Sequence, residues 1–194
     1  MIFKIPPSFS AETLLHLCRH FSSLPPEEIQ SLQDKGFTLQ EIQKEFSLPG
    51  SKFHNPPFSG LNALVQFIQY NWSSRLDLSE KKDILTSTWN LSKAEYPQGI
   101  GTDGIVAIQS LNVEEKNKIY HKDRKGTIVN AYPTQQVVIS HSLVLISKIS
   151  EKDLSCITIY PGTYAPPFPD PSMEADYYNL CKEFWNKHAL IESA

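Results

Sequence analysis

The 194-residue chain is short of cysteine, with only three: Cys18, Cys156 and Cys181. They lie far apart and form no C-x-x-C pair, which excludes the usual cysteine-based zinc motifs. The odd number also argues against a disulfide framework of the kind that small secreted proteins use. We therefore expect three free, buried thiols.

Long apolar runs and an excess of charge of one sign are also missing. No apolar run approaches the roughly 18 residues that a membrane-spanning helix needs. Pro6 and Pro7 interrupt the short apolar N-terminus before it could act as a signal peptide. The formal net charge of -3 excludes a global attraction to nucleic acid, so any such binding would come from a local patch. These absences predict a soluble protein in the reducing cytoplasm, with no membrane partner.

The common metal, nucleotide and hydrolase motifs do not occur. The six histidines form no H-E-x-x-H motif, and the His16/His20 pair has no acidic or cysteine ligand pattern nearby. Gly99, Gly101 and Gly104 match a G-x-G-x-x-G spacing, but a strand rather than a helix is predicted after them, so the phosphate-binding geometry fails. No P-loop and no G-x-S-x-G is present. The sequence predicts neither a metal nor a cofactor.

One segment, Leu32–Ile42, resembles the front of a helix-turn-helix, with two short helices joined across Gly36. Pro49, Pro56 and Pro57 then break the recognition helix that should follow. A small helical hairpin is therefore the preferred interpretation, and we do not expect this segment to bind DNA.

Helical patterns dominate the first half of the chain. Ser10 is a suitable N-cap for the first helix, Gly36 ends the second, and Thr38 with Glu41 forms a capping box for the third. Apolar residues repeat at helical spacing most clearly in the fourth. The predicted helices are Ala11–Phe21, Pro25–Lys35, Leu39–Phe46, Gly60–Asn71 and Ser79–Trp89.

The second half of the chain is rich in β-branched runs. A proline-rich extended cover over residues 161–171 and an amphipathic helix, Ser172–Ile191, follow the last of them. The predicted strands are Ile105–Leu111, residues 127–133, Val137–Ile146 and Leu154–Tyr160.

Helices followed by strands favour an α+β fold. We expect a single domain over residues 1–194, with a helical part over residues 1–92 and a sheet plus C-terminal helix over residues 100–194. The sheet should be mainly antiparallel, with four or five strands, and the N-terminal helical half should pack on it.

The strongest polar cluster is His121, Lys122, Asp123, Arg124 and Lys125, directly before Gly126. Lysine and arginine in such a cluster can hold a phosphodiester while the histidine transfers protons. The alternative is a solvated hairpin rim, because the same composition is typical of turns. The sequence leaves both interpretations open.

His141 is unusual because it interrupts an apolar strand together with Ser140 and Ser142. Thr158 and Tyr160 lie at alternate positions of the next strand, so they should point to one face. His141 would share that face if the strand register allows. The alternative is a structural histidine whose hydrogen bonds are satisfied inside the protein.

Short motifs in this half resemble a known family. D-R-K-G-T-I-V at residues 123–129 looks like a turn leading into a strand, and Thr158–Pro161 ends a late strand with T-I-Y-P. Asn130–Pro133, N-A-Y-P, is similar. These motifs resemble the barnase, EndoU, colicin and RelE-like ribonuclease domains of bacterial polymorphic toxins. The resemblance implies helices packed before a four-stranded antiparallel sheet, and metal-independent cleavage of RNA. It implies the site candidates His121, Arg124, His141, Thr158 and Tyr160.

Two functions follow as hypotheses. The first is a metal-independent RNase in which His121 or His141 is the acid or base and Arg124 also acts, with Tyr160 among the catalytic residues. Its substrate-binding residues would be Lys122, Thr158 and Ser142. The second is a non-enzymatic module that binds a protein partner through residues 160–169, where prolines alternate with aromatic side chains. The RNase hypothesis needs a basic patch near His121 that reaches His141 on the same face.

Overall fold

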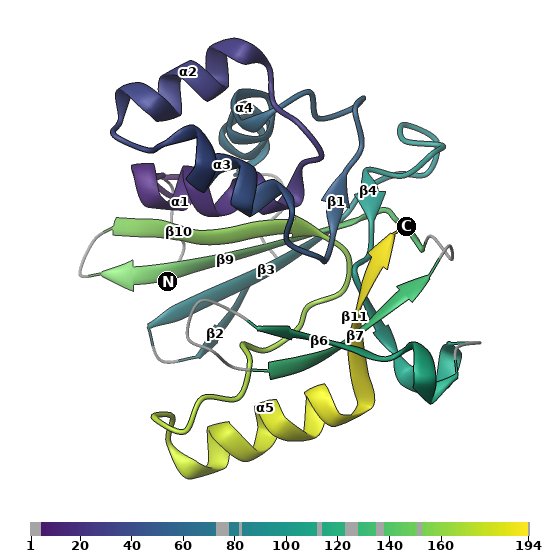
Figure 1. Ribbon diagram of the computed structural model, residues 1–194. Helices are drawn as coiled ribbons and strands as arrows, with labels where there is room; N and C mark the ends of the chain where they lie inside the picture. The colour runs from purple at the N-terminus through teal and green to yellow at the C-terminus, as the bar shows by residue number, and fades with distance from the viewer. Residues whose placement is uncertain are drawn as a thin grey trace.

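The computed structural model describes residues 5–72, 78–81, 83–111, 114–122, 128–134, 138–150 and 153–193 (Figure 1). Among these residues the strands form three small sheets. Helices α1 to α4 lie on the upper side of the molecule in Figure 1, and α5 lies on the lower side. The predicted α+β class is confirmed.

The largest ladder belongs to a four-stranded sheet with the order β10-β9-β3-β2, antiparallel throughout. Its edge strand β10 contains a bulge between Cys156 and Thr158, where the register to β9 shifts. The strands are β2 (Leu78–Lys81), β3 (Ile84–Asn90), β9 (Ser142–Ser150) and β10 (Asp153–Pro161).

The N-terminal helices cover this sheet, and the main hydrophobic core lies between the helices and the sheet. Fully buried side chains come from both layers, such as Ile42 and Leu64 from the helices and Leu143 and Ile159 from the sheet. The helices are α1 (Ala11–Leu17), the 3-10 turn η1 (Cys18–His20), α2 (Pro26–Asp34), α3 (Leu39–Phe46) and α4 (Leu61–Asn71).

A second four-stranded sheet, in the order β5-β11-β7-β6, lies beside α5. Its β11–β7 pair is parallel, and the other two pairs are antiparallel. Trp185 of α5 packs in a separate small core with Val129, Ala131 and Leu190. The elements are β5 (Ile105–Ala107), β6 (Ile119–Lys122), β7 (Ile128–Thr134), α5 (Ala175–Lys187) and β11 (His188–Ser193).

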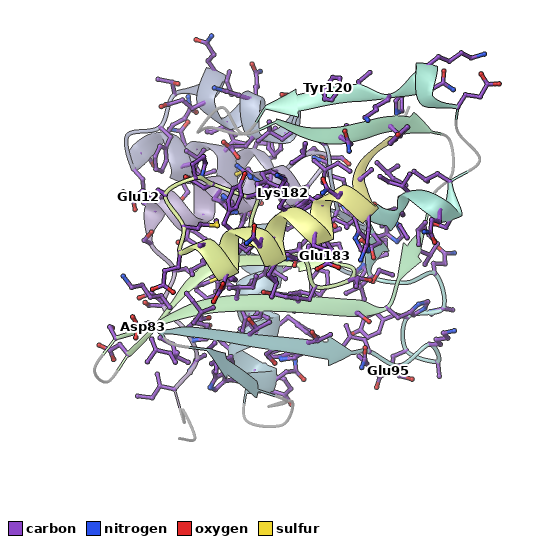
Figure 2. The ribbon with its side chains drawn as sticks, turned by 90° about the horizontal axis from the view of Figure 1, so that it is seen from below. Glu12, Asp83, Glu95, Tyr120, Lys182 and Glu183 are labelled. Atoms are coloured by element: carbon purple, nitrogen blue, oxygen red, sulfur yellow. The ribbon has the colours of Figure 1, made fainter. Side chains whose placement is uncertain are left out.

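Figure 2 views the molecule from the side of α5, which lies across the front of that view with Lys182 and Glu183 on it. A third, three-stranded sheet joins distant parts of the chain in the order β1-β4-β8. Its members are β1 (Lys52–Phe53), β4 (Gly101–Thr102) and β8 (Ile139–Ser140). Short 3-10 turns, η3 (Ile108–Ser110) and η4 (Glu115–Asn117), follow β5.

Several local predictions are confirmed. Ser10 caps α1, and the capping box of Thr38 and Glu41 begins α3, whose bounds are those predicted. Gly36 ends α2 with a φ of 98°. Strand β10 matches the predicted last strand within one residue. All three cysteines are free and buried.

Other element predictions are wrong. The predicted helix Ser79–Trp89 is the hairpin β2–β3, so residues 1–92 are not wholly helical. The C-terminal helix ends at Lys187 and continues as β11, which pairs with β5 and β7. The predicted strand Ile105–Leu111 stops at Ala107.

The predicted central strand also differs from the structure. Val137 lies outside the described residues, and the rest is divided into β8 and β9, with His141 between them. The strands divide among three sheets instead of forming one, because β11 and β4 provide pairing partners that local periodicity does not show.

Candidate functional site

Two histidines of the N-terminal helix lie against β10. His16 lies in the last turn of α1 and His20 ends η1, so both lie on one side of the helix, one turn apart. Leu15, Leu17 and Cys18 are buried between and beside them and hold this helix on the protein. The two imidazole rings meet edge to face with 6.2 Å between centroids.

The edge of β10 is attached to the segment that precedes α1. Ser8 forms a parallel bridge to Ser155, with its amide donating to Leu154 O at 2.8 Å and its carbonyl accepting from the Cys156 amide at 2.8 Å. The Thr13 hydroxyl donates to Cys156 O at 2.9 Å. These contacts fix α1 along β10 just before the bulge.

After the bulge, Thr158 and Tyr160 lie opposite Ile146 and Val144 of β9. Alternate residues of a strand point to the same face, so the prediction that these two side chains share a face agrees with the register. Both meet the histidines. We call His16, His20, Thr158 and Tyr160 the histidine cluster.

The Thr158 hydroxyl lies between the two imidazoles. Its Oγ1 is 3.2 Å from His16 Nε2 and 3.4 Å from His20 Nε2. His20 Nδ1 is 3.0 Å from the carbonyl oxygen of Ser51.

These contacts determine the proton positions. A carbonyl oxygen only accepts, so Nδ1 of His20 donates to Ser51. Neutral His20 then has an unprotonated Nε2, which accepts from the Thr158 hydroxyl, and that oxygen in turn accepts from Nε2–H of His16. The result is a directed chain of hydrogen bonds from His16 through Thr158 to His20.

The surroundings of His20 keep its imidazole neutral. Burial lowers the pKa of His20 well below its ordinary value, and the nearby charges of His16, Arg19 and Lys52 lower it further, against an opposing contribution from the Ser51 hydrogen bond. His20 is therefore neutral throughout the neutral range, with its Nε2 unprotonated.

Tyr160 supports the cluster from the side. Its ring centroid lies 5.7 Å from that of His20, and its hydroxyl oxygen accepts from the Ala165 amide at 3.1 Å. The side chain is buried, and burial raises the pKa of the phenol above its ordinary value. Tyr160 is therefore a neutral phenol, and its ring packs beside the ring of His20.

The other candidates from the sequence lie elsewhere. His141 lies between β8 and β9, where its carbonyl accepts from the Leu91 amide at 2.9 Å; its Nε2 is buried and has no hydrogen-bond partner among the described residues. The Ser142 hydroxyl donates to Asn90 Oδ1 at 2.8 Å. Neither of these hydrogen-bond partners, Asn90 and Leu91, belongs to the histidine cluster.

The basic cluster belongs to a different sheet. The backbones of His121 and Lys122 lie in β6, paired with Val129 and Ile128 of β7. The side chains of His121 and Lys122, and all of Arg124, lie outside the described residues. The basic patch reaching His141, which the RNase hypothesis needs, therefore stays a prediction.

His16 and His20 are the residues that sequence reasoning missed. Their i,i+4 spacing is visible in the sequence, but as a metal motif it lacks further ligands. Across the described ranges, no group of three or more His, Cys, Asp or Glu residues could hold a metal ion. The partner of the histidine pair is a threonine 142 residues away from His16 in the chain.

No family model and no curated protein matches this chain. Within the described part of the chain, none of the helices has the length and apolar character needed to cross a bilayer.

Proposed function

We propose that the chain is an RNase-like protein that cleaves RNA without a metal ion, using His16 and His20 as acid and base. The observation that carries this proposal is the single hydroxyl, that of Thr158, within 3.2 Å of one imidazole nitrogen and 3.4 Å of the other. An oxygen at that point faces a lone pair on His20 and an N–H on His16.

RNA cleavage needs these two roles. A base takes the proton of the 2′-hydroxyl, the freed oxygen attacks phosphorus, and an acid gives a proton to the leaving 5′-oxygen. Neutral His20 would take the first proton at Nε2, with the 2′-hydroxyl in the place that Thr158 Oγ1 holds in this structure, and Nε2–H of His16 would give the second. The products would be a 2′,3′-cyclic phosphate and a free 5′-hydroxyl.

The architecture supports the same proposal. Helices precede a four-stranded antiparallel sheet whose last strand, β10, ends in Thr158–Pro161, as the resemblance to the toxin ribonucleases implies. Lys122 and Ser142 stay proposed substrate contacts, Arg124 stays a proposed catalytic residue, and His121 and His141 are the alternative acid and base. The three free thiols fit the reducing, cytoplasmic setting that we propose.

The test is an RNA cleavage assay in EDTA with single alanine variants. Replacement of His16 or His20 should lower the rate by about 10²-fold or more, because each removes an acid or base. His54→Ala is the matched control, a half-buried histidine on the loop after β1. Loss of activity in His121→Ala or His141→Ala alone would move the site to those residues, and no cleavage by the native chain would end the proposal.

The alternative, a partner surface over residues 160–169, has less support. Trp185 Nε1 donates to Pro166 O and Pro167 O at 3.1 and 3.2 Å, and Phe168 packs on the Trp185 ring at 4.7 Å between centroids. Most of the segment is therefore used to attach α5 to the rest of the protein. Tyr164 is its exposed aromatic residue.

A further inference from the structure

Lys52 has an unusual environment for a lysine. Its half-buried ammonium group donates to three backbone carbonyls, Arg19 O, Phe46 O and Leu48 O, at 2.5, 2.9 and 3.0 Å. The first of these carbonyls belongs to η1, and the other two lie at the end of α3 and just beyond it. Carbonyls at helix ends lack partners within the helix, so a lysine that binds them fixes both ends to β1.

These contacts enclose the hydrogen bond that orients His20. Arg19, whose carbonyl Lys52 holds, directly precedes His20. Ser51, whose carbonyl accepts from His20, directly precedes Lys52. The two hydrogen bonds, Lys52 to Arg19 O and His20 to Ser51 O, thus join the segments Arg19–His20 and Ser51–Lys52 into a closed ring. Neither His20 nor the Ser51 carbonyl can shift without breaking the hydrogen bond of Lys52.

We propose that Lys52 is a positioning residue of the histidine cluster, which fixes the carbonyl that orients His20 and holds its Nε2 toward Thr158. The catalytic part of this inference rests on the proposed RNase function, whereas the effect on the ring of His20 does not. Lys52 contacts no substrate in this proposal, since all three of its donors face the protein.

Lys52 also acts on His20 through its charge. The groups that face His20 are His16 from α1, Arg19 from η1, Lys52 from β1 and Tyr160 from β10. Arg19 is paired with Glu45 of α3, and Tyr160 is neutral. Removing the Lys52 charge should therefore raise the pKa of His20, since that charge disfavours the imidazolium.

The direct test is an NMR titration of the histidine ring nitrogens in Lys52→Met and Lys52→Arg. In the native protein we expect His20 as the Nδ1–H tautomer, neutral through the mildly acidic range. Lys52→Met should mix the tautomers and move the titration of His20 to higher pH, whereas Lys52→Arg, which keeps the charge, should not move the titration. Lys44→Met, an exposed lysine of α3, is the matched control. An unchanged His20 in Lys52→Met would overturn the inference.

If Lys52→Met does not fold, the native protein supplies the same test. Burial lowers the pKa of Lys52 to about 8, so mild alkali removes the charge without a substitution. The signals of His20 should then change in a step near that pH, and the step should be absent from Lys52→Arg. No step in the native protein would contradict the inference.

The cleavage assay separates the two proposals. Because the titration of His20 moves to higher pH in Lys52→Met, the effect should be visible at about pH 5, where kcat should fall roughly tenfold with KM unchanged. This loss is smaller than the loss expected from removing the acid or the base itself. A native chain that cleaves no RNA, but whose His20 responds to Lys52, would refute the RNase function and leave the positioning role. If the native chain cleaves RNA but Lys52→Met leaves the signals of His20 unchanged, the positioning role would be refuted and the RNase function would stand.

Discussion

Arg19 of η1 donates two hydrogen bonds to a single oxygen of Glu45 on α3, from Nε at 3.1 Å and from Nη2 at 2.8 Å. The Glu45 side chain is 2% exposed and that of Arg19 is 24% exposed, so this ion pair is mostly buried, one residue before His20. Together with Lys52 it fixes η1 to α3. The position of His20 therefore depends on polar contacts that lie behind the histidine cluster.

The first prediction concerns this ion pair. Glu45→Gln should destabilise the protein by about 3 kcal/mol, because Arg19 keeps its charge in a mostly buried place while its counter-charge is lost. Glu41→Gln on the same helix is the control, since glutamine also serves in a capping box. Urea unfolding of the two variants measures the difference. Equal stability would show that Arg19 finds water instead of the Glu45 carboxylate.

A second carboxylate, that of Glu28 on α2, caps α4. Its two oxygens accept from the amides of Leu61 and Asn62 at 2.7 and 2.9 Å. Glu28→Ala should cost about 1–3 kcal/mol, because two amides at a buried helix start lose a charged acceptor. Glu27→Ala, one position earlier and exposed, should cost far less. Equal urea midpoints for the two variants would contradict a capping role for Glu28.

Gly162 tests the connection between β10 and β4. It has a φ of +130°, and a Cβ there would lie 2.6 Å from Asp103 Oδ1. Asp103 accepts from the amides of Ile105 and Thr163, so it cannot move aside freely. Gly162→Ala should cost about 2 kcal/mol or more, from strain and overlap together.

Gly36 is the matched control for that substitution. It also has a positive φ, +98°, but a Cβ there has open space around it. Gly36→Ala should therefore show the backbone strain alone, about 1 kcal/mol. Thermal unfolding of both variants separates the two effects, and an equal loss of stability would mean that the contact with Asp103 adds nothing.

The sequence predicts the structure correctly where neighbouring residues determine it. The capping box of Thr38 and Glu41 fixes the start of α3 by contacts within four residues, and Ser10 does the same for α1. The helix predicted over β3 is wrong, because the inward-facing Ser87 is buried and accepts from Trp89 Nε1 at 2.6 Å. A polar residue on the core face obscures the alternation that indicates a strand.

The remaining errors have a long-range cause. β11 is a strand because it pairs with β5 and β7. No local pattern in His188–Ser193 indicates this pairing. The site shows the same limit, since Thr158 was predicted from its strand while its histidine partners lie more than 130 residues earlier. The sequence shows the histidines and the threonine, but their contact depends on how α1 lies along β10.

The last prediction concerns acid. The fold lowers the pKa of His20, whereas in the unfolded chain the same histidine titrates near its ordinary value of about 6.5. Below that pH the unfolded chain binds a proton that the folded protein refuses, so the free energy of unfolding falls as the pH falls. The stability that neutral His20 contributes is fully present above about pH 6.5 and is lost progressively toward its folded pKa.

His20→Gln removes this dependence, because a glutamine amide can still donate to the Ser51 carbonyl and takes up no proton. Between about pH 6.5 and 5, the native protein should lose stability faster than the variant, by at most about 1.4 kcal/mol per pH unit for one proton. Urea unfolding at several pH values gives the two slopes, with His54→Gln as the control. Parallel slopes for the native protein and His20→Gln would mean that His20 takes up its proton in the folded state as readily as in the unfolded chain. That result would contradict the proposal that neutral His20 is the base.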